Sequence, residues 1–245
     1  LQQAGHEVVF VARGESLRVL REHGLTLIRA DGQTAQLRVV ATDTIAAIDT
    51  ADVVIIAVKT WQVADVARQL SGFKCARTRF LTLQNGVEAP HEVGAQVGLE
   101  RVLGGLVRGF FELEAPGRVR HVGVTPTIIF GQIDGGRTPE AEALYRALTE
   151  AGIYSELHDD VEVALWEKFL LVTSLSGVGA VTRAPIGDLR AHAATRRMLE
   201  TVMGEIVAVG KARGVALADD LVARTFKFVE TFPPETTTSM QRDLI

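Results

Sequence analysis

Lys168 is the only positively charged residue in a long apolar run that spans residues 161–181. If this run is helical, the neighbours three and four positions away are all apolar: Ala164, Leu165, Leu171 and Val172. The ammonium group must then extend to water, pair with a carboxylate, or face a cleft in which its charge is used. In a cleft it can stabilise negative charge that develops on an oxygen and deliver a proton to that atom. The run alone leaves the packing and the catalytic alternatives open.

Two polar residues follow strongly apolar runs in the first half of the chain. Lys59 comes directly after residues 52–58, and Asn85 comes shortly after residues 80–83. In parallel sheets, ligands bind at the carboxyl ends of the strands. Gly86, next to Asn85, permits close approach of the backbone to a ligand. Lys59 and Asn85 are therefore candidates for a cofactor site, with ordinary turn residues as the alternative.

Arg13 follows another predicted strand, at residues 6–12. In dinucleotide-binding sheets an acidic residue at this point binds the ribose 2′-hydroxyl, whereas an arginine accommodates the 2′-phosphate of NADP. Arg13 therefore favours NADP, with a solvated arginine as the alternative. The motif G-x-G-x-x-G, which usually binds the pyrophosphate, is absent. Residues 1–5 are typical of the tail of the preceding helix, so we expect the chain to begin within the fold.

Strand-like and helix-like segments alternate in the first part of the chain. We expect strands at 6–12, 25–28, 37–40, 52–58, 80–83, 102–107, 119–122, 127–130 and 154–157. We expect helices at 16–22, 61–70, 87–97 and 139–151. Such alternation is typical of a parallel sheet with helices on both faces.

The second part of the chain carries only helical patterns, at 161–181, 190–213 and 219–230. We therefore predict an α/β fold in which a Rossmann-type parallel sheet domain, incomplete at its N-terminus, spans residues 1–157. An all-α helical domain for substrate binding or dimerisation would span residues 158–245, with its C-terminal end missing.

The composition of the 245 residues is that of a globular protein, with 47% hydrophobic residues. The net charge of −4 gives no reason to expect nucleic acid or an anionic membrane as a partner. The single cysteine, Cys75, excludes an internal disulfide, and the six histidines show no metal-ligand spacing. We expect a cytoplasmic protein without a metal. The apolar run after Lys168 contains Thr, Ser and Gly and predicts a buried helix, not a membrane span.

Several short motifs occur together in this chain and carry a resemblance to a known family. They are Gly5-His-Glu-Val8, Arg13-Gly14, Val58-Lys-Thr-Trp-Gln-Val63, Gln84-Asn-Gly-Val87, Trp166-Glu-Lys168 and Ser239-Met-Gln-Arg-Asp243. In this order they resemble 2-dehydropantoate 2-reductase, also called ketopantoate reductase. The resemblance spans essentially the whole chain.

The resemblance implies NADPH-dependent reduction of 2-dehydropantoate to (R)-pantoate, a step of pantothenate and coenzyme A biosynthesis. It implies that Lys168 donates the proton and that Lys59 and Asn85 contact the cofactor near the reacting centre. It also implies that Arg13 holds the 2′-phosphate and that Ser239, together with Lys168 and Asn85, contacts the substrate. The oligomeric state stays open, a homodimer included.

Three departures from the family pattern bear on this expectation. The glycine-rich loop is absent, and the chain ends at Ile245 before the glutamate that the family usually carries. Both suggest a fragment. The family often has asparagine four and eight residues after the lysine, where this chain has Val172 and Ser176. The alternatives are therefore a reductase of another 2-keto acid, an opine- or hydroxyacid-type dehydrogenase, and a non-catalytic protein that senses NADP.

Overall fold

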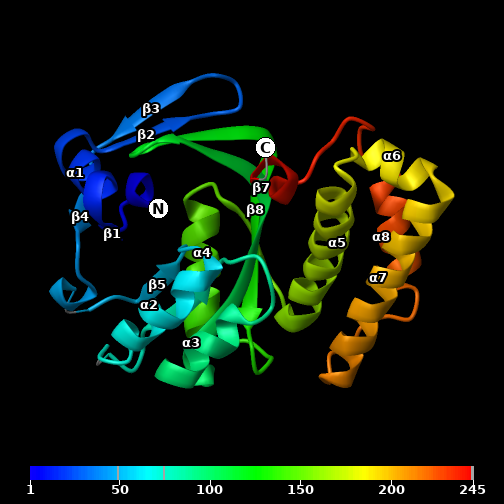
Figure 1. Cartoon of the computed structure of the whole chain (residues 1–245). Coiled ribbons are helices and arrows are strands. Elements are labelled where there is room, and N and C mark those ends of the chain that lie inside the picture. The colour runs from blue at the N-terminus through cyan, green and yellow to red at the C-terminus, as the bar shows by residue number, and fades with distance from the viewer. Residues whose placement is uncertain (49, 74, 244–245) are drawn as a thin grey trace. The chain divides into compact units, whose positions relative to one another are not determined.

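The computed structural model describes residues 1–48, 50–73 and 75–243 of the chain. They divide into two compact units, drawn together in Figure 1. The first, here called the α/β unit, comprises Leu1–Gln84 and Glu88–Val161. The second, here called the helical unit, comprises Asn85–Val87 and Glu162–Ile245. The α/β class and the helical class predicted for the two parts of the chain are confirmed.

The larger sheet of the α/β unit has the strand order β3-β2-β8-β7-β6-β5, and β9 pairs with β8. Its strands are β2 (Leu25–Ile28), β3 (Thr34–Leu37), β5 (Val53–Ile56), β6 (Arg79–Thr82), β7 (Val102–Ala115), β8 (Arg118–Gln132) and β9 (Tyr154–Leu157). The sheet is mixed: β5, β6 and β7 run parallel, as expected for a Rossmann-type sheet, whereas β7 with β8 and β2 with β3 run antiparallel. Only Pro116 and Gly117 separate β7 from β8, and so short a connection can only reverse the chain.

The long hairpin of β7 and β8 replaces three shorter predicted strands. In Figure 1 it runs in green from the core of the unit to the edge where β2 and β3 lie. Residues 119–122 and 127–130, expected as separate strands, are both part of β8. Phe110, Phe111 and Leu113 are exposed on this hairpin.

A second, two-stranded sheet in the α/β unit consists of β1 (Val9–Val11) and β4 (Val40–Thr42), which run parallel. The strand predicted at 37–40 is divided in the structure, because Leu37 ends β3, which pairs antiparallel with β2, whereas Val40 begins β4. Within the described residues no strand joins β1 to β5, so the two sheets stay separate.

The helices of the α/β unit are α1 (Gly14–His23), α2 (Val63–Leu70), α3 (Ala89–Val97) and α4 (Pro139–Glu150), with short 3₁₀ turns η1 (Gln2–Ala4), η2 (Ile45–Ala47), η3 (Thr60–Gln62) and η4 (Leu99–Arg101). Helix α4 shows why these segments fold as they do. The Thr138 hydroxyl caps it by accepting from Ala141 N at 3.2 Å, and Pro139 occupies its first turn. Its buried side chains, spaced three and four residues apart, pack on the sheet beside Leu81 and Phe130.

The helical unit contains α5 (Val161–Thr182), α6 (Ile186–Ala191), α7 (Ala193–Ala212), α8 (Leu221–Val229) and α9 (Ser239–Asp243). The single helix predicted at 190–213 is instead α6 followed by α7, because the backbone at His192 is extended. The Thr195 hydroxyl stabilises the break, since it donates to the carbonyl of Leu189 at 2.7 Å.

Helix α5 is, among the described residues, the one helix long and apolar enough to cross a membrane, and half of its most apolar window is buried. Trp166 on this helix is 4% exposed. A Cβ atom at Gly210 of α7 would lie 3.0 Å from its ring, so the glycine lets α7 approach closely. These are the contacts of a core helix in the helical unit.

Candidate active site

Lys59 lies at the carboxyl end of β5, as the sequence predicted. Strand β5 pairs in parallel with β6, and Ile56 is opposite Thr82 at the ends of the two strands. Beyond β5, Lys59 caps the turn η3, where its backbone N donates to Gln62 Oε1 at 3.2 Å. The Lys59 side chain is exposed, and so is that of Trp61, at 78%. The Lys59 ammonium group is therefore accessible to a ligand at this edge of the sheet.

Asn85 follows β6 at the same edge of the sheet. Gly86 beside it has a φ of 105°, a left-handed conformation that other residues rarely adopt. The Asn85 side chain is exposed. Residues Asn85–Val87 cluster with the helical unit, so Asn85 belongs to the same compact unit as Lys168.

Gln84 connects the ends of β5 and β6, and sequence reasoning assigned it no role. It is 7% exposed, and its Nε2 donates to the carbonyls of Ile56 and Val58, each at 2.9 Å. The signal in the sequence was a long polar side chain at the end of an apolar strand. Such a group must find partners when it is buried.

Lys168 lies in the first half of α5, next to residues that attach this helix to α7 and α8. Trp166 packs on Gly210, and the Glu167 carboxylate pairs with Arg224 of α8 at 2.9 Å. Because a helix turns about 100° per residue, Lys168 points about 200° away from Trp166. Lys168 thus lies on the face of α5 opposite the one packed on α7, and its side chain is half-buried.

Val172 and Ser176 follow Lys168 on the same face of α5, one and two turns later. Val172 is half-buried, and Ser176 is 4% exposed. A ligand bound to this face beside Lys168 would contact the hydrocarbon side chain of Val172 one turn along the helix and the hydroxyl of Ser176 two turns along.

Ser239 begins α9. This helix contacts the C-terminal part of α5, whereas Lys168 lies in the first half of α5. The amide of Gln241 donates to the carbonyl of Ala184 at 2.9 Å, and a Cβ atom at Gly179 would lie 2.8 Å from Gln241 Oε1. Gly179 is about 16 Å along the helix from Lys168, at 1.5 Å per residue. These contacts therefore do not bring Ser239 next to Lys168.

Arg13 lies between β1 and α1 in the α/β unit and is exposed. Within the described part of the chain, its guanidinium group makes no hydrogen bond or ion pair. Gly14 after it has a φ of 55°. A free cationic group at the carboxyl end of β1 fits the 2′-phosphate of NADP.

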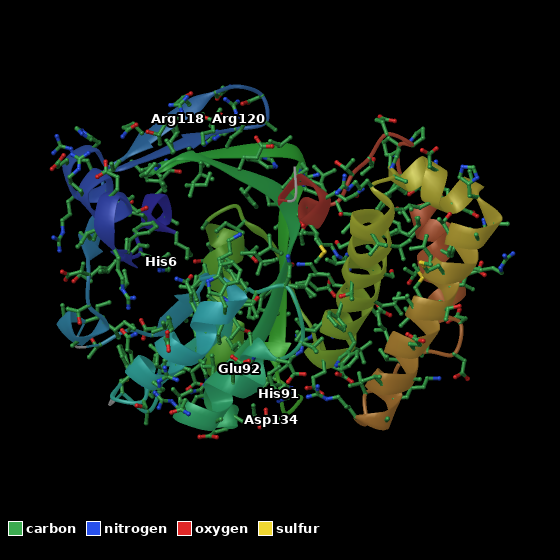
Figure 2. The ribbon with its side chains drawn as sticks, in the orientation of Figure 1. His6, His91, Glu92, Arg118, Arg120 and Asp134 are labelled. Atoms are coloured by element: carbon green, nitrogen blue, oxygen red, sulfur yellow. The ribbon has the colours of Figure 1, made fainter. Side chains whose placement is uncertain are left out.

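No group of histidine, cysteine and acidic side chains that could hold a metal occurs among the described residues. Figure 2 shows, for example, that His6 lies near β1 and well away from His91 on α3.

The amino-acid sequence matches a known family over most of the chain. The family model described as "Ketopantoate reductase PanE/ApbA" matches residues 1–135, and "Ketopantoate reductase PanE/ApbA C terminal" matches residues 160–245. The chain belongs to the ketopantoate reductase family. Ketopantoate reductases are NADP-dependent oxidoreductases that act on CH–OH groups, and this chain is an enzyme of that type.

Individual relatives agree with the family assignment. The chain is 31% identical to a 2-dehydropantoate 2-reductase of Halobacterium salinarum, over 98% of this chain and 80% of that protein. It is 26% identical to "Uncharacterized oxidoreductase YkpB" of Bacillus subtilis, over 100% of this chain and 80% of that protein.

Solved structures share the fold of this chain. A ketopantoate reductase from Ralstonia eutropha superposes with a TM-score of 0.86 at 29% identity, covering 99% of this chain and 78% of that one. A D-mandelate dehydrogenase solved with NADH superposes with a TM-score of 0.84 at 20% identity, which shows the fold alone.

Proposed function

We propose that this ketopantoate reductase family member reduces 2-dehydropantoate to (R)-pantoate with NADPH, and that Lys168 donates the proton. The observation that carries the proposal is the position of Lys168. It is half-buried on the face of α5 turned away from α7, in the compact unit that also contains Asn85. The relatives named 2-dehydropantoate 2-reductase support the choice of substrate.

The chemistry suits an ammonium group. When bound, NADPH supplies a hydride to the C2 carbonyl carbon of the keto acid. Negative charge then develops on the C2 oxygen, and a positive charge beside this oxygen stabilises it. The Lys168 ammonium transfers a proton to that oxygen, which completes the hydroxyl group, and the neutral amine regains a proton from water. Before the transfer, the same charge attracts the carboxylate of the substrate.

The other site residues have binding roles in this proposal. Arg13 holds the 2′-phosphate through charge-assisted hydrogen bonds, while Lys59 and Asn85 contact the cofactor near the reacting centre. Asn85 also contacts the substrate. Ser239 is a substrate contact on the motif match alone, since α9 contacts α5 near Gly179.

A second candidate function is the reduction of a different 2-keto acid by the same mechanism. Val172, one turn after Lys168, is the observation that favours it, because a hydrocarbon side chain there offers no hydrogen bond to a substrate hydroxyl. A 2-keto acid with an apolar branch in place of the hydroxymethyl group of 2-dehydropantoate would suit this surface.

The deciding experiment measures NADPH oxidation by the protein expressed from its complete reading frame, with 2-dehydropantoate and with a panel of apolar 2-keto acids. We expect Lys168→Ala to lower kcat by about 10²- to 10⁴-fold, the usual contribution of a positioned general acid. Lys227→Ala, an exposed lysine on α8, is the control and should leave kcat unchanged. Near-normal turnover by Lys168→Ala would remove Lys168 from the mechanism.

The panel of substrates separates the two candidate functions. A kcat/KM that is highest for 2-dehydropantoate supports the pantoate assignment, and a preference for an apolar keto acid supports the second candidate. With the first outcome, we propose a role in pantothenate and coenzyme A biosynthesis in the cytoplasm. Gel filtration with light scattering would test for the homodimer that the family resemblance permits.

A further inference from the structure

The amide of Gln84 occupies a position that none of the proposed catalytic or binding roles explains. Its Nε2 atom uses both protons, one on the carbonyl of Ile56 and one on the carbonyl of Val58. Val58 directly precedes Lys59, and Gln84 itself directly precedes Asn85. One side chain therefore joins the two peptides from which the proposed cofactor contacts continue.

We propose that Gln84 is a positioning residue of the cofactor site, which holds the main chain before Lys59 against the main chain before Asn85. This inference rests on the proposed function only in that it takes Lys59 and Asn85 as cofactor contacts. Backbone pairing alone leaves the end of β5 less constrained. Leu83 N donates to the Ile56 carbonyl at 3.2 Å, and Ile56 with Thr82 is the last aligned pair of the two strands. The Gln84 amide extends the connection past the last paired residues, as far as Val58.

The amide cannot be replaced by another buried group of the same size. A methionine has no donor, so the Val58 carbonyl would lose the Gln84 hydrogen bond, and an asparagine is shorter by one methylene. The orientation of the amide is also determined, because a flipped amide would turn its oxygen toward two carbonyl oxygens. Gln84 Oε1 is buried and has no partner in the described part of the chain, so the contacts of this side chain come from its nitrogen.

Gln132 provides a matched control within the same unit. It is 2% exposed, its Nε2 donates to the carbonyl of Glu100 at 2.6 Å, and its Oε1 likewise lacks a partner among the described residues. Glu100 precedes β7, which runs parallel to β6. This amide therefore lies at the amino ends of β6 and β7. Each of the two glutamines therefore donates from its amide to main-chain carbonyls, Gln84 at the carboxyl ends of the parallel strands and Gln132 at their amino ends.

The test compares Gln84→Met with Gln132→Met, each in the protein expressed from its complete reading frame. Both should lower the melting temperature, since each removes a buried hydrogen bond. Only Gln84→Met should lower kcat/KM for NADPH, by about 10- to 100-fold, because displacement of a contact by an ångström has costs of this order. Gln84→Asn, which keeps the two donors at shorter reach, should have an intermediate effect and serves if Gln84→Met does not fold.

Equal kcat/KM values for the two folded methionine variants would overturn the positioning role and leave Gln84 as a packing residue. If the wild-type protein oxidises NADPH with none of the keto acids, the proposed function fails independently of this inference. The dissociation constant for NADPH then replaces kcat/KM as the readout. A weaker constant for Gln84→Met than for Gln132→Met supports the inference, and equal constants overturn it.

Discussion

Arg190 donates to the carbonyl oxygen of Phe232 at 2.8 Å and so joins two residues that are 42 positions apart in the helical unit. The same Nη1 atom lies 2.9 Å from the carbonyl of Val229 and 3.1 Å from that of Glu230. Of these residues, Val229 and Glu230 lie at the C-terminal end of α8, where the helix supplies no donors of its own, and Phe232 follows shortly after. Arg190 therefore holds the start of the segment that leads to α9 and Ser239.

Arg190→Ala should destabilise the helical unit by about 1–3 kcal/mol, since hydrogen bonds from a charged donor to several carbonyls are lost. Arg197→Ala removes an exposed arginine from α7 and should change the stability by less than about 0.5 kcal/mol. Thermal or urea unfolding followed by circular dichroism gives both values. Equal stabilities of the two variants would show that the contacts of Arg190 contribute nothing.

Arg13→Ala should raise KM for NADPH by about 10- to 100-fold, because the 2′-phosphate loses a charge-assisted hydrogen bond. KM for NADH, which lacks this phosphate, should stay unchanged. Arg29→Ala removes another exposed arginine of the α/β unit and is the control. A parallel rise in KM for both cofactors in Arg13→Ala would contradict the assignment of Arg13 to the phosphate.

Gly131→Ala should destabilise the protein by about 1–3 kcal/mol or more through overpacking. A Cβ atom at Gly131 of β8 would lie 2.2 Å from the carbonyl oxygen of His158, and this backbone atom follows β9 and cannot rotate away. Gly204→Ala on α7 is the control substitution, because nothing lies within 4 Å of the position that its Cβ atom would take. That substitution should stabilise the helix by about 0.5–1 kcal/mol. The melting temperatures should therefore move in opposite directions.

The stability of the β7–β8 hairpin should depend on pH through Glu114. Its carboxylate accepts from Arg118 Nε at 2.7 Å and from Arg120 Nε, two side chains that Figure 2 places together on this hairpin. The hydrogen bonds from Arg118 and then Arg120 hold the pKa of Glu114 below its usual value. A carboxyl whose pKa is lowered by folding stabilises the protein above its ordinary pKa, and this contribution is lost as the pH falls through the lowered value.

Glu114→Gln tests this dependence. The melting temperature of the wild type should exceed that of the variant at pH 7, and the difference should shrink toward zero as the solution is acidified below the ordinary glutamate range. A difference that is the same at neutral and acidic pH would exclude the ion pairs with Arg118 and Arg120 as its source.

The sequence predicted the positions of β5 and β6 better than the continuity and the pairing of the longer strands. Lys59 and Asn85 were predicted to follow strands because each comes after an apolar run, and the structure has β5 and β6 there. The continuity of β8 was missed because Pro126 is a strand-breaking signal. In the structure Pro126 lies where the pairing of β7 with β8 shifts register, between Arg108 and Phe110, and such an irregularity tolerates the missing amide proton.

The side-chain contacts of the site could not be predicted from the same patterns. Gln84 belongs to the motif Gln84-Asn-Gly-Val87, but its partners, Ile56 and Val58, are distant in the sequence and depend on the pairing of β5 with β6. The break between α6 and α7 was missed for a similar reason. Helical periodicity continues across His192, and the bond from Thr195 to Leu189 becomes visible only in three dimensions.

The two tryptophans differ strongly in solvent exposure, so their intrinsic fluorescence can report on the two units of the protein. Trp61, 78% exposed two residues after Lys59, should emit at long wavelength and be quenched by iodide, whereas Trp166, 4% exposed on α5, should emit at short wavelength and resist the quencher. Loss of the iodide-sensitive component on addition of NADPH would report a ligand at the end of β5. A red shift of the protected component would report unfolding of the helical unit, so spectra recorded with and without iodide follow each unit separately.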